Sequence, residues 1–283
     1  MSLGVLNNIS AIYAQTNLNM TQKSLQNTLT QLSSGSRINS GADDAAGLAL
    51  ADGLHANVAA LTQSAQNASA GVGMLQTADG SLAQVTNLLN RAITLATEAA
   101  NGTLNTSQVS SADQEYQNIL TEIGNIGSTT NYNGQAVFSA TPVTVFVSDG
   151  TTSGSTSFSE TIGALTTASV GTTSGGGAGS DLTASATLSG ATASTILNTL
   201  TSAVQNVAYQ RGTIGANINQ LNAAANVANT QSVNLSSAEN DIRATNFGQA
   251  TSDMAKYKVL SQTGIAALSQ ANAVQQDVLK LLQ

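Results

Sequence analysis

The stretch QLSSGSRINSGADDAAGLALAD, residues 31–52, interrupts two long segments in which apolar residues recur at helical spacing. Before it, Leu18, Leu25 and Leu32 are seven residues apart, which is heptad spacing. After it, apolar residues recur in steps of three and four from Leu54 to Ala96. A glycine-containing break between two such patterns predicts a joint between two helices.

Four charged residues lie within this break, and three of them, Arg37, Asp43 and Asp44, are close to its centre. We expect Gly35 and Gly41 to let the backbone leave the first helix, and Arg37 to pair with Asp43 or Asp44 across the connection. Ser40 or Asp43 is the expected N-cap of the second helix, whose positive N-terminus favours the acidic pair. The same pair could suggest acid–base catalysis, but adjacent carboxylates on a helix do not converge on one pocket.

The composition excludes several classes of function. Charged residues make up 8% of the chain and aromatic residues 3%, where about 25% charged is usual, so we expect surfaces that meet other protein through small side chains. There is no cysteine and one histidine, His55, which argues against disulfides, thiolate or zinc centres and triad catalysis. A net charge of −7 argues against nucleic acid, and the sequence suggests neither a membrane span nor a cofactor.

The remainder of the chain alternates between helical and extended patterns. The long helix is expected to stop at Asn101–Gly102, and a shorter helix covers about 107–126. Asn133–Gly134 is a hairpin signal, with strands expected between about 135 and 165. A Ser/Thr/Gly stretch centred on 175–177 is expected to be a surface excursion up to about 187. Heptads return from Leu200 and end near Leu235, and a last helical pattern runs from 260 to 281.

These patterns predict a mainly α fold of long antiparallel, coiled-coil-like helical rods, with paired terminal helices and a small β-hairpin or β-rich middle segment. We expect one region of terminal helices, 1–42 with 238–283, linked near 33–46. A second region, 43–140 with 190–237, contains the rods and the hairpin, and 141–189 is a short surface-exposed segment. Arg211 at a core heptad position either packs its stem with an exposed head or pairs with an acid from a neighbouring helix.

The terminal helices carry the residues expected to pack within the core or between subunits. These are Leu18, Leu25, Leu32, Leu260, Leu268, Val274 and Leu281. Because both terminal segments lack a complete partner in the sequence, we expect them to pack on one another and to need further cover. His55 is expected to be solvated or interfacial, and no catalytic constellation is present.

The break also carries a family resemblance. LSSGSRINS at 32–40 and DDAAGLA at 43–49 resemble bacterial flagellin, as do QTADGSL at 76–82, NYNG at 131–134, LSQTG at 260–264 and VLKLL at 278–282. The likeness covers about 1–138 and 196–283. It implies a structural protein that polymerises into the extracellular flagellar filament and is exported unfolded through the flagellar type III system. It implies the terminal helices as the inner layer of that filament, and the chain itself as its main partner.

The resemblance further implies contacts with an export chaperone at the C-terminal helix, with the filament cap and with hook–filament junction proteins. Members of the family sensed by a Toll-like innate receptor carry a motif that this chain matches only at Arg91 and Leu95, with Glu115 as a possible acidic partner. We therefore expect weak recognition by that receptor. The alternatives are a hook–filament junction protein of the same superfamily, or a monomeric adhesin or immune ligand.

Overall fold

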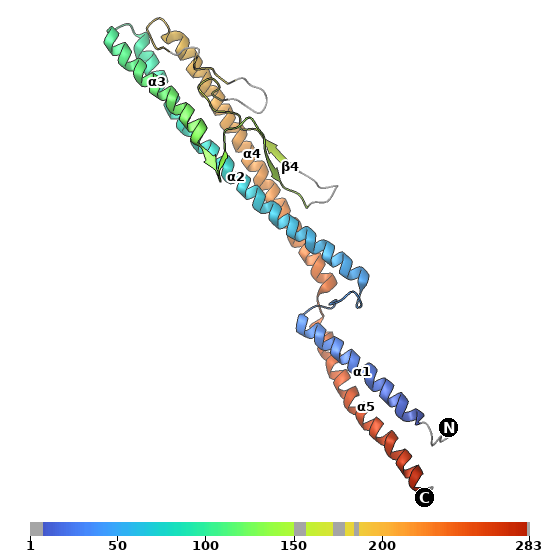
Figure 1. The fold of residues 1–283 in the computed structure, drawn as a ribbon. Coiled ribbons are helices and arrows are strands. Elements are labelled where there is room, and N and C mark those ends of the chain that lie inside the picture. Colours follow the sequence, from blue (N-terminus) through green and yellow to red (C-terminus); the bar gives the residue numbers. More distant parts are fainter. Residues whose placement is uncertain (1–7, 150–156, 172–178, 184–186, 282–283) are drawn as a thin grey trace. The chain divides into compact units, whose positions relative to one another are not determined.

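The chain forms two compact units, and each is described by itself (Figure 1). The computed structural model describes residues 8–149, 157–171, 179–183 and 187–281, with side chains up to residue 276. The terminal unit combines residues 1–56 with 234–283, and the central unit is 57–233. Among the described residues, no helix is long and apolar enough to cross a membrane.

In the terminal unit, helix α1 (Ile9–Ser34) and helix α5 (Phe247–Leu281) lie side by side and antiparallel (Figure 1). At one end the side chain of Asn8 donates a hydrogen bond to the carbonyl of Ala271, at 2.9 Å. At the other end the amide of Thr245 donates to the carbonyl of Gly35, at 3.0 Å. The predicted pairing of the terminal helices is therefore confirmed.

The central unit is built on three long helices (Figure 1). They are α2 (Ala45–Ala100), α3 (Thr106–Thr129) and α4 (Ala193–Arg243), of which α2 and α4 also extend into the terminal unit. Helix α2 ends where Asn101–Gly102 predicts, with Gly102 in the left-handed region at φ 65°. A capping box between Asn105 and Gln108 starts α3.

Large aliphatic side chains at heptad spacing fill the centre of this unit. The fully buried ones include Leu82, Leu89, Ile123, Ile196, Leu200, Ile214 and Leu221. At the edge of the core, Arg211 of α4 makes two hydrogen bonds to Asp79 of α2, at 2.7 and 3.3 Å. Of the two alternatives for Arg211, the structure therefore selects pairing with an acid from a neighbouring helix.

Two small antiparallel ribbons follow α3. Strands β1 (Asn131–Tyr132) and β2 (Gln135–Ala136) are joined by the predicted turn, with positive φ at Asn133 and Gly134. Strands β3 (Val143–Phe146) and β4 (Ser157–Glu160) form the second ribbon, within the predicted range. Val145 packs against Gly71 of α2, where a side chain would collide with it.

The segment 141–189, which the sequence predicts to be surface-exposed, also contributes apolar side chains to the core of the central unit. Five apolar residues of this segment are almost fully buried in the core of the central unit: Ile162, Leu165, Val170, Leu182 and Leu188. The side chain of Gln210 in α4 donates to the carbonyl of Ile162, and Asp113 of α3 accepts from the amide of Leu188 at 2.6 Å. The low-complexity composition concealed these widely spaced anchors. The predicted centre of the excursion, 175–177, lies outside the described residues.

The second helix boundary was also misplaced. Helix α4 continues past Leu235 to Arg243, and α5 begins at Phe247 rather than near 260. The break is short and lacks glycine or proline, which is why the apolar pattern did not reveal it. Its local signal is Asn246, whose side-chain oxygen accepts from the amide of Gln249 at 3.2 Å in the manner of an N-cap.

Candidate self-association surface

The predicted joint consists of two chain segments, one from each break between helices. Gly35, with φ 72°, ends α1 and donates its amide to the carbonyl of Gln31 at 2.9 Å. The following residues pair with the segment after α4: Ser36 forms an antiparallel bridge to Ala244, and the amide of Arg37 donates to the carbonyl of Arg243 at 2.6 Å. Gly41 has no positive φ, so only Gly35 makes the turn that we expected from both.

Arg37 acts on a helix end rather than on the acidic pair. Its guanidinium donates to the carbonyl of Ile242 at 2.8 Å, in the last turn of α4. A cation at this position is favoured because the last carbonyls of a helix carry partial negative charge. Arg37 therefore binds the C-terminal end of α4 instead of forming the expected ion pair with Asp43 or Asp44. This contact is possible because the break between α4 and α5 lies next to the break between α1 and α2.

The two aspartates have different roles. The Asp43 carboxylate accepts from the amides of Asn39 and Ser40, at 3.1 and 2.9 Å, and these hydrogen bonds lower the pKa of Asp43. Asp44 accepts from the first amides of α2, those of Ala46 and Gly47, at 3.1 and 2.9 Å. Asp44, and not Ser40 or Asp43, therefore caps the helix, because Asp43 is already engaged in closing the preceding turn.

The predicted packing residues of the terminal helices occupy different environments. Leu18, Leu25, Leu32 and Leu268 are half-buried, Leu260 and Val274 are exposed, and the side chain of Leu281 lies outside the described part. At the seam between α1 and α5, Leu18 lies close to Gly264. A Cβ added to Gly264 would be 3.2 Å from the Cδ1 of Leu18. Small and polar residues occupy much of the rest of the seam, among them Ala11, Ala14, Thr28, Ser261 and Ala271. The predicted heptad thus faces α5, but it buries little apolar surface.

Four further large apolar side chains of α1 lie on its opposite face. Ile9, Ile12, Tyr13 and Met20 are 56–68% exposed, and we call them the α1 stripe. Their spacing places them on one side of the helix, and Met20 is two residues, or about 200° around the axis, from Leu18. The predicted packing residues include none of these four, although all four follow helical spacing.

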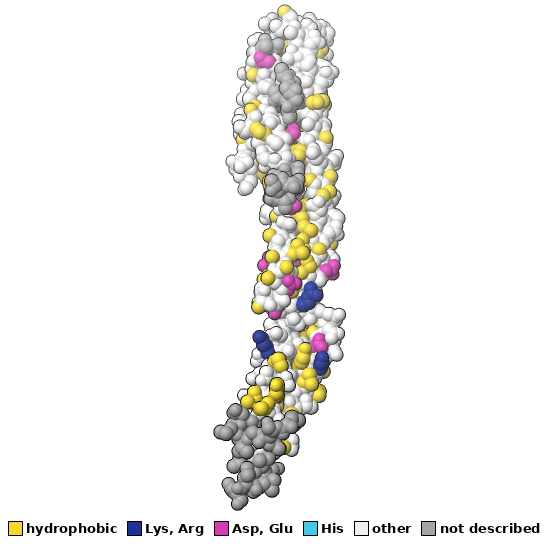
Figure 2. All heavy atoms as spheres, turned by 90° about the vertical axis from the view of Figure 1, so that its right-hand side faces the viewer, with side chains coloured by type: hydrophobic (Ala, Val, Ile, Leu, Met, Phe, Trp, Pro, Cys, Tyr) yellow, Lys and Arg dark blue, Asp and Glu magenta, His cyan; other side chains and the backbone are white. Residues whose placement is uncertain are grey.

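Helix α5 also exposes large apolar side chains. Phe247, Val259, Leu260, Ile265 and Val274 are each 43–58% exposed. Figure 2 shows hydrophobic side chains at the surface of the terminal unit and only scattered charges on the face in view. Large apolar side chains exposed in groups are typical of protein contacts. The chemistry available here is therefore hydrophobic association.

The charged residues near the joint form a solvated cluster rather than a metal centre. His55 Nδ1 lies 3.2 Å from Glu239, and Arg243 lies 3.6 Å from both Glu239 and Asp52. The His55 side chain is 69% exposed. No group of three or more metal-ligating side chains occurs within the described ranges.

The three residues considered for innate-receptor contact do not form one exposed surface. Arg91 of α2 and Glu115 of α3 bind each other through two hydrogen bonds of 2.7 and 3.0 Å, and this pairing lowers the pKa of Glu115. Leu95 is 2% exposed and belongs to the core of the central unit. Its side chain is therefore unavailable to a receptor in this fold, because heptad packing turns it toward the core.

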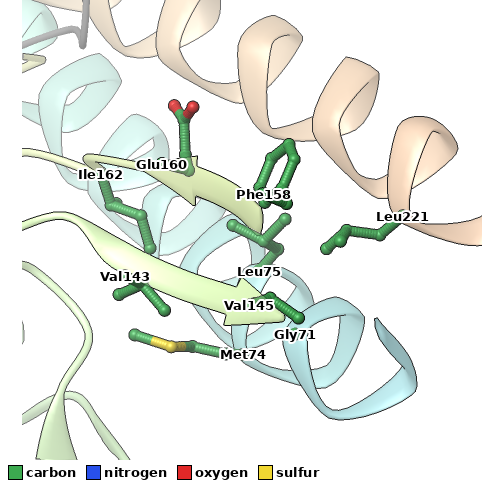
Figure 3. A pocket seen from close by; sticks show the side chains of 9 residues that line it. All are labelled: Gly71, Met74, Leu75, Val143, Val145, Phe158, Glu160, Ile162 and Leu221. Carbon is green, nitrogen blue, oxygen red and sulfur yellow. The ribbon is translucent and has the colours of Figure 1, made fainter. Parts of the chain in front are cut away.

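A small apolar cavity in the central unit offers no ligand site (Figure 3). Its volume of about 10 Å³ is at the lower limit for one water molecule. The only charged residue in its lining is Glu160, whose carboxylate points away from the apolar side chains in Figure 3. Burial raises the pKa of Glu160, and the side-chain amide of Asn217 partly offsets this increase.

Comparisons with known proteins agree with the extent of the resemblance. Family models match residues 5–142, as "Bacterial flagellin N-terminal helical region", and 197–282, as "Bacterial flagellin C-terminal helical region". The chain is 31% identical to the "Flagellar filament 30.7 kDa core protein" of Treponema maltophilum, over 97% of this chain and 98% of that protein. It is 29% identical to the flagellin of Listeria monocytogenes, with coverage of 97% and 98%.

Among solved structures, the crystal structure of Bacillus cereus flagellin is 27% identical, with a TM-score of 0.47, and the match covers 62% of this chain and 94% of that one. The two family models together span most of the sequence and leave out residues 1–4, 143–196 and 283. The middle of these gaps corresponds to the region, about 139–195, that the sequence resemblance does not cover. The chain therefore belongs to the bacterial flagellin family.

Proposed function

We propose that this chain is a structural subunit of the bacterial flagellar filament, that it is not an enzyme, and that its terminal helices drive its assembly. Its family membership supports the filament role. The observation that carries the assembly mechanism is the α1 stripe, which lies on the face of α1 opposite α5. An apolar face that its own chain leaves uncovered is suited to contact with another copy.

The energetics favour repeated weak contacts. Full burial of a large apolar side chain stabilises by about 1.5–3 kcal/mol, so covering the exposed half of each stripe residue contributes roughly 1 kcal/mol. Four such residues on α1, and the exposed apolar residues of α5, give several kcal/mol per subunit. Extended growth further requires contacts that do not close into a ring.

In this proposal the terminal helices form an inner layer of the filament and the central unit an outer layer. The layers correspond to the regions expected from sequence, 1–42 with 238–283 and 43–140 with 190–237. Residues 141–189 then face outward on one side while their apolar anchors remain in the core. The extracellular filament is the proposed location, reached by type III export of the unfolded chain.

Further partners belong to the proposal. The exposed apolar residues of α5 suit an export chaperone that covers this helix before assembly, and the ends of a filament require the cap and the hook–filament junction proteins. We propose that recognition by the Toll-like receptor is weak, because Arg91 and Glu115 bind each other and Leu95 is buried.

A seeding experiment tests this function. Purified chain is incubated with and without sheared filament fragments, and the pelleted fraction is measured by sedimentation, with helicity followed by circular dichroism. We expect seeded polymerisation. Ile12→Glu, within the α1 stripe, should abolish it, whereas Gln15→Glu introduces the same charge at an exposed polar position of α1 and should assemble. Leu268→Asp at the seam should also prevent assembly while the central unit remains helical.

The same experiment separates the alternatives. A chain that stays monomeric with seeds, and whose terminal helices are already stable, would favour a monomeric adhesin or immune ligand. A chain that binds filament ends without elongating them would favour a hook–filament junction protein. Normal assembly of Ile12→Glu would contradict the assigned role of the stripe even if the wild-type chain polymerises.

A further inference from the structure

We propose that Met20 is a peroxide-sensitive modification site, at which oxidation of the unassembled chain blocks self-association. The inference rests on the proposed function and names a chemical control of the same surface. Met20 lies within the α1 stripe and is 56% exposed. Methionine is the residue of the stripe that hydroperoxides oxidise readily, and the change in polarity is large.

The three methionines in the described part of the chain provide an internal scale of accessibility. Met20 is the most exposed, Met254 is half-buried on α5, and Met74 is 6% exposed in the core of the central unit. Since oxidation requires contact between the thioether sulfur and peroxide, the structure assigns the order Met20, Met254, Met74. Met74 should react only when the central unit opens.

The reaction is an oxygen-atom transfer. The Met20 thioether sulfur attacks one peroxide oxygen, an S–O bond forms as the O–O bond breaks, and water leaves. Sulfur loses two electrons and the peroxide gains them. The product is a sulfoxide, which is polar and accepts hydrogen bonds, and methionine sulfoxide reductases reverse the change.

The position of Met20 determines the consequence. Met20 points about 200° away from Leu18, so its oxidation leaves the contact of α1 with α5 in place. Burial of the sulfoxide oxygen against another copy would leave it without a donor on an apolar surface. A penalty of this kind raises the concentration of unassembled chain by about tenfold or more. Once assembly has covered Met20, the same residue should be protected.

The first measurement is the rate of oxidation. Monomer and seeded filaments are treated with hydrogen peroxide, and each methionine is quantified by peptide mass spectrometry with fragmentation. We expect Met20 to react fastest in the monomer and at least several-fold more slowly in filaments. Equal rates for Met20 and Met74 in the monomer, or equal rates for Met20 in both states, would overturn the proposal.

The second measurement is seeded assembly after oxidation. The wild-type chain should lose assembly and regain it after treatment with methionine sulfoxide reductase. Met20→Leu removes the sulfur with little change of volume, and whatever extent of assembly this variant has without peroxide should stay the same after treatment. The matched control Met254→Leu should stay sensitive. Full assembly of wild-type chain with oxidised Met20, or peroxide sensitivity of Met20→Leu, would overturn the proposal. Failure of untreated chain to assemble would instead refute the proposed function.

Discussion

Replacement of Gly127 by alanine tests whether the middle segment is part of the core. Gly127 lies in the last turns of α3, directly beneath the backbone of residue 165. A Cβ at this position would collide with the carbonyl oxygen of Leu165 and lie 2.9 Å from its carbonyl carbon. Because a backbone carbonyl cannot rotate away as a flexible side chain can, the segment must move off the helix.

Two opposing effects set the magnitude. Glycine to alanine in a helix gains up to about 1 kcal/mol. Displacement of Leu165, which is 4% exposed, loses much of the roughly 1.5–3 kcal/mol that its burial contributes. We therefore expect Gly127→Ala to lower the free energy of unfolding by about 1–2 kcal/mol.

The matched control is Gly124→Ala, one turn earlier in α3. There the nearest atom to an added Cβ is the Thr167 methyl at 3.8 Å, an ordinary contact. This variant should gain about 0.5–1 kcal/mol. Urea unfolding followed by circular dichroism measures both, and the two variants should differ by roughly 2–3 kcal/mol. Leu165→Ala alone and combined with Gly127→Ala completes a double-mutant cycle, in which the costs should be less than additive.

If Gly127→Ala stabilises the chain as much as Gly124→Ala does, the backbone at 165 does not pack on α3. Fully additive costs in the cycle would mean that Leu165 is not displaced by the new methyl group. Either outcome would return residues 141–189 to the surface role that their composition suggests.

Three further predictions concern single side chains. Burial raises the pKa of Glu160. The contribution of Glu160 to the free energy of unfolding is therefore favourable at low pH and is lost as the pH rises through the folded-state pKa. Glu160→Gln should raise stability at neutral pH but not near pH 3, and the exposed Glu122→Gln serves as the control. Burial raises the pKa of Tyr116 to about 12, and its hydroxyl has no hydrogen-bond partner among the described residues. Tyr116→Phe should therefore gain about 1 kcal/mol in urea unfolding, and a loss of stability would contradict this reasoning. Arg37→Glu places a negative charge at the end of α4, which should lower the free energy of unfolding by about 1–2 kcal/mol and alter filament shape or assembly. Arg37→Gln keeps a hydrogen-bond donor and should have a smaller effect. Seeded assembly and electron microscopy measure both variants.

The helices of the central unit were predictable because large residues at heptad spacing are buried there. Leu82, Leu89 and Leu200 each serve the local pattern and the tertiary core at once. The middle segment was not predictable in the same way. Its anchors, such as Val170 and Leu182, are isolated in sequence, and their burial depends on α3 and α4 leaving space for them. The overall composition of a segment does not predict which of its few apolar residues pack into the core.

The joint was predictable in kind but not in its contacts. Gly35 marked one break because a left-handed residue favours glycine. The second break has only Asn246 as a signal, and without it the partner of Arg37 could not be identified. Two acids within seven residues were the nearest candidates in sequence, whereas the actual acceptor is more than two hundred residues away. Local sequence suffices for caps and turns, but not for backbone acceptors supplied by a distant segment.

The terminal helices reverse the usual arrangement of a helix pair, and this reversal connects their sequence to assembly. In the central unit the large aliphatic residues are fully buried, whereas α1 leaves Leu18 and Leu25 only half-buried at the seam and exposes Ile12 and Tyr13 on the face away from α5. A helix pair that was stable by itself would have the opposite distribution, because burial of the larger residues contributes more. The exposed apolar residues of α1 leave further stabilisation available on its outer face. We expect neighbouring copies to cover this face, which would couple the ordering of the termini to growth of the polymer.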